Sequence, residues 1–189
     1  MATWPDDVQI VFKHNALSFH KDARLAAIAS MAAARQGHFW KYHDQLFTDT
    51  KKLKRADLIK YAEDLGLDMA QFKADLEDKK LALKVDNDQA AAVALGATGT
   101  PAFFVNGVKL SGAKPFEEFK KEIDAQLAKA KELEAKGTPR SAIPRTLALQ
   151  SGATATNFVK YIIDEKAAPK QAAKKAPPKK QEDTKTVWK

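Results

Sequence analysis

The sequence excludes thiol chemistry by this chain on its own. Its 189 residues contain no cysteine, so no thiolate can attack a disulfide, act as a nucleophile or bind a metal. The motifs GxxxxGK[ST], GxGxxG and GxSxG, which mark phosphate loops, dinucleotide sites and hydrolase elbows, do not occur. We therefore expect no catalytic residue and no cofactor in this chain.

Histidine is the remaining side chain suited to proton transfer or metal binding near neutral pH. The four histidines are His14, His20, His38 and His43. A helical metal site uses two histidines four positions apart, whereas His38 and His43 are five apart and point to different helix faces. We therefore expect no metal site. The simplest expectation for His14, at the end of a predicted strand, is a hydrogen-bonded surface histidine.

The most informative segment begins with the turn residues Thr98, Gly99, Thr100 and Pro101. An apolar run, Ala102–Val105, follows and is typical of a strand. Asn106-Gly107 is the strongest two-residue signal for a β-hairpin, so we expect residues 108–110 to return as the partner strand.

The hydrophobic pattern of the other segments predicts one strand and several helices. The β-branched run Val8–Phe12 predicts a buried strand. Helical spacing of apolar residues predicts helices over 22–35, 39–47, 54–65, 69–76, 79–95, 115–136 and 154–165. In the helix at 115–136 we expect an inner face formed by Phe116, Phe119, Ile123 and Leu127.

An aromatic stripe in the second helix has two interpretations. It consists of Phe39, Trp40, Tyr42 and Phe47. At helical spacing, packing in a core between helices is the favoured interpretation, and a peptide-binding groove is the alternative.

Taken together, VQIVFKH, the helical segment opening with FHKDA, and GATGTPAFFVNGVKLSGAKPFEEFKKEI resemble the DsbA family of thioredoxin-fold proteins. The resemblance covers about residues 8–128. It implies an α/β, thioredoxin-like fold with an α-helical insertion, and a cis peptide bond between Thr100 and Pro101. It also implies that the loop of Thr98, Gly99, Thr100 and Pro101 faces the active site and pairs with extended or unfolded polypeptides, with His14 nearby.

The resemblance also implies what this chain lacks. Family members carry a CxxC pair at the N-terminus of their first helix, after a central first strand. Only seven residues precede Val8, so we expect an N-terminally truncated domain with an incomplete sheet and no CxxC segment. Unpaired backbone groups on the neighbouring strands would each cost about 1–3 kcal/mol, so we expect marginal stability unless a partner supplies the strand.

Two functions follow as hypotheses. The first is an incomplete domain of a family that exchanges protein thiols and disulfides in the cell envelope, with this chain alone inactive. The second is a non-catalytic module that binds extended peptides. No secretory signal precedes the first strand, so we expect a cytoplasmic location for the chain as written.

We expect three parts along the chain: a DsbA-like domain over 1–136, a helical extension over 137–165, and a basic, disordered linker or tail over 166–189. The tail holds eight lysines and two acidic residues, and therefore most of the net charge of +8. It lacks the interleaved aromatic residues that stack on bases, so nucleic acid is not an expected partner. No apolar run is long enough to predict a membrane span.

Overall fold

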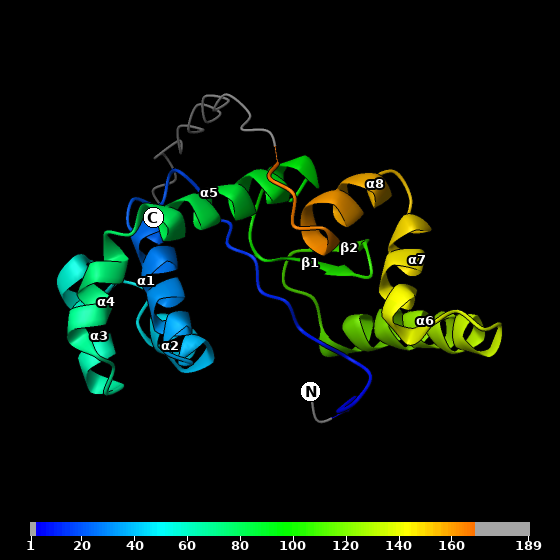
Figure 1. The fold of residues 1–189 in the computed structure, drawn as a ribbon, viewed down its shortest axis with the longest axis horizontal. Coiled ribbons are helices and arrows are strands. Elements are labelled where there is room, and N and C mark those ends of the chain that lie inside the picture. The colour runs from blue at the N-terminus through cyan, green and yellow to red at the C-terminus, as the bar shows by residue number, and fades with distance from the viewer. Residues whose placement is uncertain (1–2, 169–189) are drawn as a thin grey trace, which may run out of the picture.

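The structure is a computed structural model that describes residues 3–168 (Figure 1). The predicted tail therefore lies outside the described residues from position 169 onward. In chain order the elements are α1 (Ala23–Arg35), α2 (Phe39–Thr48), α3 (Arg55–Asp64), α4 (Met69–Leu76), α5 (Lys79–Ala94), β1 (Ala102–Val105), β2 (Val108–Ser111), α6 (Phe116–Ala135), η1 (Arg140–Ala142), α7 (Ile143–Leu149), α8 (Ala155–Phe158) and η2 (Val159–Ile163).

Helices α1 to α4 and the first half of α5 form one cluster around a hydrophobic core. Small alanines on α1 let the neighbouring helices approach closely, and Ala29, Ala32 and Ala33 have no exposed surface. Tyr42 of α2 and Phe72 of α4 fill the centre, with their ring centroids 5.8 Å apart. The predicted helical insertion is therefore confirmed, and it packs as a unit.

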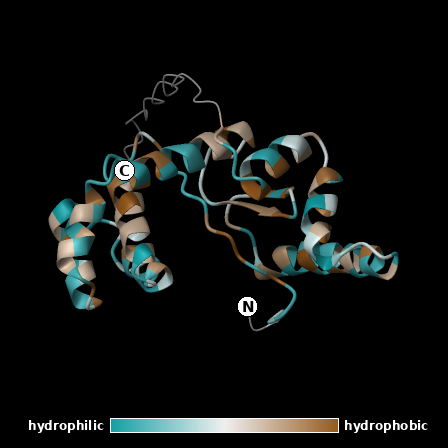
Figure 2. Ribbon diagram, viewed as in Figure 1, coloured by the Kyte–Doolittle hydropathy of each residue, from teal (hydrophilic) through white to brown (hydrophobic). Residues whose placement is uncertain are grey.

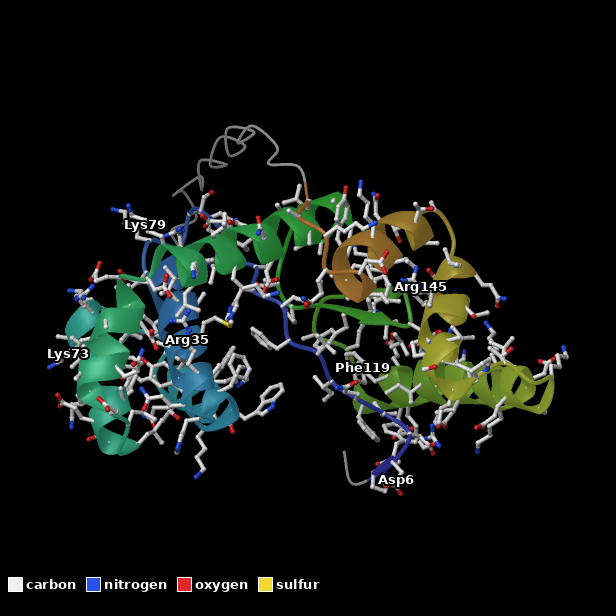
Figure 3. All side chains as sticks on the ribbon, in the orientation of Figure 1. Asp6, Arg35, Lys73, Lys79, Phe119 and Arg145 are labelled. Atoms are coloured by element: carbon white, nitrogen blue, oxygen red, sulfur yellow. The ribbon has the colours of Figure 1, made fainter. Side chains whose placement is uncertain are left out.

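Helix α5 leads from this cluster to the β-hairpin and the C-terminal helices (Figure 1). Helix α6, which carries the Phe119 labelled in Figure 3, covers one face of the hairpin. The rings of Phe103 and Phe119 lie there with their centroids 4.7 Å apart. The other face contacts the C-terminal elements, where Phe104 lies 5.7 Å from Phe158. Residues 137–168 therefore contribute to a second core together with Leu95 at the end of α5.

The hairpin has the predicted two-residue turn. Asn106 and Gly107 both have positive φ, 47° and 92°, as such a turn requires, and Val105 pairs with Val108 across it. The strands are antiparallel, and they form the only sheet within residues 3–168. No helix in these residues is long and apolar enough to cross a membrane.

The prediction of a buried strand at Val8–Phe12 is wrong. The segment has no strand pairing, and Ile10 and Val11 are 57% and 59% exposed. A β-branched run favours extended backbone, but a strand forms only where a neighbour pairs with its N–H and C=O groups. No other segment of the described chain pairs with it.

Two helix faces also differ from expectation. In the aromatic stripe only Tyr42 is buried, whereas Trp40 is 49% and Phe47 is 66% exposed, so the core-packing interpretation is wrong for these two residues. In α6, the first residue, Phe116, is 54% exposed, so it does not belong to the inner face. Phe119, Ile123 and Leu127 are partly buried as expected, and Gln126 is the one fully buried residue of α6.

Candidate peptide-binding site

The loop Thr98–Pro101 connects α5 to β1 and is exposed along its length. Its Thr100–Pro101 peptide bond is cis. The loop lines a shallow cavity of about 210 Å³, with walls from Gly96, Ala97, Ala102, Lys109, Ser111 and Gly112. The Lys109 ammonium closes one side by donating a hydrogen bond to the Gly96 carbonyl at 2.5 Å. The cavity is therefore lined mostly by residues with small side chains.

The free edge of β1 continues from this loop. In an antiparallel pair, hydrogen-bonded positions alternate with positions whose backbone groups point away from the partner strand. With a two-residue turn, Val105 and Phe103 are positions whose N–H and C=O groups pair with β2. Pro101 is the next such position, and its carbonyl accepts a hydrogen bond from the Gly112 amide at 2.9 Å. Ala102 and Phe104 therefore point their N–H and C=O groups outward, where no backbone group within residues 3–168 pairs with them.

The expectation that His14 is a surface histidine is wrong. It is only 6% exposed, and its backbone N–H donates to the Asp88 carboxylate at 3.2 Å. The neighbouring Asn15 side chain donates to the Ala97 carbonyl at 3.0 Å, next to the loop. Burial lowers the pKa of His14 to about 4, although Asp88 acts in the opposite direction, so the imidazole is neutral at pH 7.

An ion network that the sequence did not indicate surrounds His14. Lys13 lies 3.0 Å from Glu165 and 3.8 Å from Asp88. Lys84 lies 3.4 Å from Asp88 and 3.7 Å from Glu165. The hydrogen bond from Lys13 holds the pKa of Glu165 below its ordinary value. The network joins the N-terminal segment, α5 and the end of the C-terminal extension, which are far apart in sequence.

The structure brings His14 close to the start of the loop through Asn15 and Ala97. It gives no test of what Thr98, Gly99, Thr100 and Pro101 bind, so their role as a binding loop stays a prediction. Within residues 3–168, no group of three histidine or acidic side chains is arranged to hold a metal ion.

A hairpin that follows a cis-proline loop, covered by a helix and joined to a helical insertion, defines a thioredoxin-like class of domain. The sequence model of the DSBA-like thioredoxin domain matches residues 1–124, and the chain belongs to this family.

The curated proteins that are similar to the chain are named as antiporters and not as thioredoxin-like proteins. The chain is 46% identical to the Na(+)/H(+) antiporter NhaA of Herminiimonas arsenicoxydans over 112 residues, 59% of this chain and 18% of that protein. It is 38% identical to the Na(+)/H(+) antiporter NhaA 3 of Salinispora tropica over 125 residues, 66% of this chain and 19% of that protein. The chain thus spans less than a fifth of these relatives. No solved structure matches the chain significantly.

Proposed function

We propose that the chain is the polypeptide-binding part of a DsbA-like domain serving thiol–disulfide exchange. It holds an extended polypeptide by strand addition along the Thr98–Pro101 loop and the free edge of β1. The observation that carries this proposal is the unpaired backbone of Ala102 and Phe104 beside the exposed loop. Backbone pairing at such an edge gives affinity with little dependence on the peptide's sequence.

The exchange chemistry itself lies outside this chain, because it contains no cysteine. A thiolate must attack a disulfide sulfur, so both sulfur partners come from the bound polypeptide or from another segment. The role proposed for this chain is to hold the polypeptide extended, with its backbone fixed beside Pro101. Antiport, the activity in the relatives' names, is not proposed here, because the match covers under a fifth of those proteins.

Hydrogen exchange at single amides tests the binding mode. In the free chain, the Phe103 and Val105 amides should already be protected by β2, whereas the Ala102 and Phe104 amides should exchange rapidly. Adding a reduced, unfolded polypeptide should protect Ala102 and Phe104 selectively. Protection that spreads evenly over β1, or that leaves these two amides unchanged, would contradict strand addition.

A pair of proline variants gives the matched comparison. Pro101→Ala should weaken retention of the unfolded polypeptide, because the Pro101 ring lines the cavity beside the free edge of β1. Pro139→Ala, at the start of η1 and outside the loop, should leave retention unchanged. Equal retention by both variants and the parent chain would reject the proposed site.

A further inference from the structure

Lys109 carries the only charge in the β-hairpin. No other residue from Ala102 to Ser111 is charged, and Figure 2 shows the hairpin strands mostly in the colours of hydrophobic residues. The Lys109 side chain is exposed, and its ammonium group donates a hydrogen bond to the Gly96 carbonyl at 2.5 Å. An ammonium group has three donors, so the other two remain available. Lys109 forms no ion pair with any residue that the structure describes.

The cavity beside the Thr98–Pro101 loop has this ammonium group and several hydroxyl groups in one lining. Lys109 lines it together with Thr98, Thr100 and Ser111. None of these three hydroxyl groups is hydrogen-bonded to another residue within 3–168. Among the described residues that line the cavity, none is acidic. The cavity therefore offers hydrogen-bond donors and one positive charge, and its described lining supplies no counter-charge.

The pairing of the hairpin places this cavity on one face of the sheet. Ala102 lies across from Ser111, and Phe104 lies across from Lys109. Side chains two positions apart in a strand point to the same face, so all four residues share it. Between the free edge of β1 and Ser111, this face carries only the methyl group of Ala102. The free edge is therefore open to the cavity.

A strand added along the free edge of β1 points one of its side chains over Ala102. Residues that lie across from one another in neighbouring strands have their side chains on the same face, with Cβ atoms about 4.5–5.5 Å apart. The residue across from Ala102 therefore directs its side chain toward Ser111 and Lys109. The cavity of about 210 Å³ is smaller than the sites of about 300–1,000 Å³ that hold whole small molecules, so it suits a single side chain.

We propose that this cavity is a subsite for one acidic side chain of the bound polypeptide, and that Lys109 determines the preference. The inference rests on the proposed function, because the polypeptide must first lie along β1. A carboxylate only accepts hydrogen bonds, which matches the free donors of the Lys109 ammonium group and the Ser111 hydroxyl. A bound lysine or arginine would be repelled by Lys109, with no carboxylate in the described lining to offset the repulsion. The chain therefore favours extended polypeptides that carry Asp or Glu beside the loop.

Three peptides test the charge preference. They share one extended sequence and differ only at the central residue, which is Glu, Gln or Lys, and both termini are blocked so that no terminal carboxylate competes. The full chain should bind the Glu peptide about fivefold more tightly than the Gln peptide, as expected for an exposed ion pair of good geometry. It should bind the Lys peptide more weakly than the Gln peptide. The preference for Glu should shrink as salt is added, because salt screens exposed charges.

Lys109→Gln and Lys114→Gln form the matched variant pair, since each removes one exposed lysine and Lys114 does not line the cavity. Lys109→Gln should make the Glu and Gln peptides bind equally, and Lys109→Glu should reverse the preference toward the Lys peptide. Lys114→Gln lowers the net charge by the same amount and should keep the preference for Glu. Circular dichroism checks that each variant is folded, and the salt dependence of the parent chain tests the preference without any substitution.

The outcomes separate this inference from the proposed function. Equal binding of the Glu and Gln peptides, with the Ala102 and Phe104 amides still protected from exchange by either peptide, overturns the acidic subsite alone. A preference for Glu that survives in Lys109→Gln also overturns it. If no peptide binds or protects these two amides, the proposed function fails, and the inference fails with it.

Discussion

The amide of His14 donates to the buried carboxylate of Asp88 at 3.2 Å, and this contact joins the N-terminal segment to α5. The imidazole of His14 packs edge-on against Phe12 and Phe39 at 5.1 and 6.2 Å. Its Nε2 atom is buried and has no hydrogen-bond partner. An imidazole in these surroundings resists protonation, so the folded domain is expected to lose stability in acid.

The first prediction concerns the stability of the domain in mild acid. The unfolded chain takes up a proton at His14 near pH 6.5, whereas the folded chain takes it up only near pH 4. Between these values the unfolded state binds more protons, so the free energy of unfolding falls as the pH drops. The loss from this group approaches about 3 kcal/mol at pH 4.

Urea unfolding at about pH 7 and pH 4 measures this loss, with the pH range taken from the histidine pKa values. His14→Leu should make the loss of stability between the two conditions about 3 kcal/mol smaller than in the parent chain. His20→Leu changes an exposed histidine and should keep the parent's pH dependence. If His14→Leu loses as much stability in acid as the parent chain, the burial of a neutral His14 is refuted.

The second prediction compares two arginines on α1. Arg35, which is labelled in Figure 3, lies on α1. It forms ion pairs with Asp75 and, at 2.6 Å, with Asp78, and the Asp75 side chain is only 3% exposed. Arg35→Ala leaves that carboxylate with Gln71 as its remaining side-chain partner. The Arg35 side chain is itself 38% exposed, so water replaces part of the lost pairing. Arg35→Ala should therefore lower the free energy of unfolding by about 1–3 kcal/mol, below the loss for a fully buried pair.

Arg24 provides the control for this variant. It pairs with Asp86 through two hydrogen bonds of 2.8 and 3.0 Å, but its side chain is 50% exposed. Arg24→Ala should therefore lower the free energy of unfolding by about 0.2–1 kcal/mol. Equal losses for the two variants in urea titrations would show that Asp75 is not buried as described.

The sequence predicted the helices of the insertion and the hairpin turn, because both depend on residues that are close together in the chain. The helices of the insertion follow from apolar residues at helical spacing, and Asn106-Gly107 predicts the turn because both positions need positive φ. Val8–Phe12 failed as a strand because pairing depends on a neighbour that its own residues do not encode.

The candidate site was only partly predictable for the same reason. The segment containing Thr98–Pro101 was recognisable because its turn, strand and hairpin signals are contiguous. The contacts of Lys13 and His14 with Asp88 join residues more than 70 positions apart, and no spacing rule indicates them. Burial of His14 follows from aromatic neighbours on α2, which a single sequence does not place.

The third prediction concerns Gly107 in the hairpin turn. A Cβ atom at this position would lie 2.9 Å from the Cβ of Ser151, in addition to the strain of a φ of +92°. Gly107→Ala should therefore lower the free energy of unfolding by about 1–2 kcal/mol through φ and by a further 1–3 kcal/mol through overlap. Chemical denaturation measures both contributions together.

Gly112→Ala separates the two contributions. Its φ is +80°, and an added Cβ would have no neighbour within 4 Å, so only the backbone penalty should remain. Combining Gly107→Ala with Ser151→Gly should bring its loss down to the Gly112→Ala value. If the combination makes no difference, the residues after α7 do not contact the hairpin turn.

The last prediction tests whether residues 137–168 belong to the domain core. Phe158 is 8% exposed and packs on Phe104, so Phe158→Ala should lower the free energy of unfolding by about 3–5 kcal/mol. Leu149→Ala, at a position that is 54% exposed, should change it by about 0.5 kcal/mol or less. A double-mutant cycle with Phe104→Ala should show coupling, because each ring buries part of the other. Additive losses in that cycle, or a Phe158→Ala loss no larger than that of Leu149→Ala, would mean that the hairpin folds without the C-terminal helices.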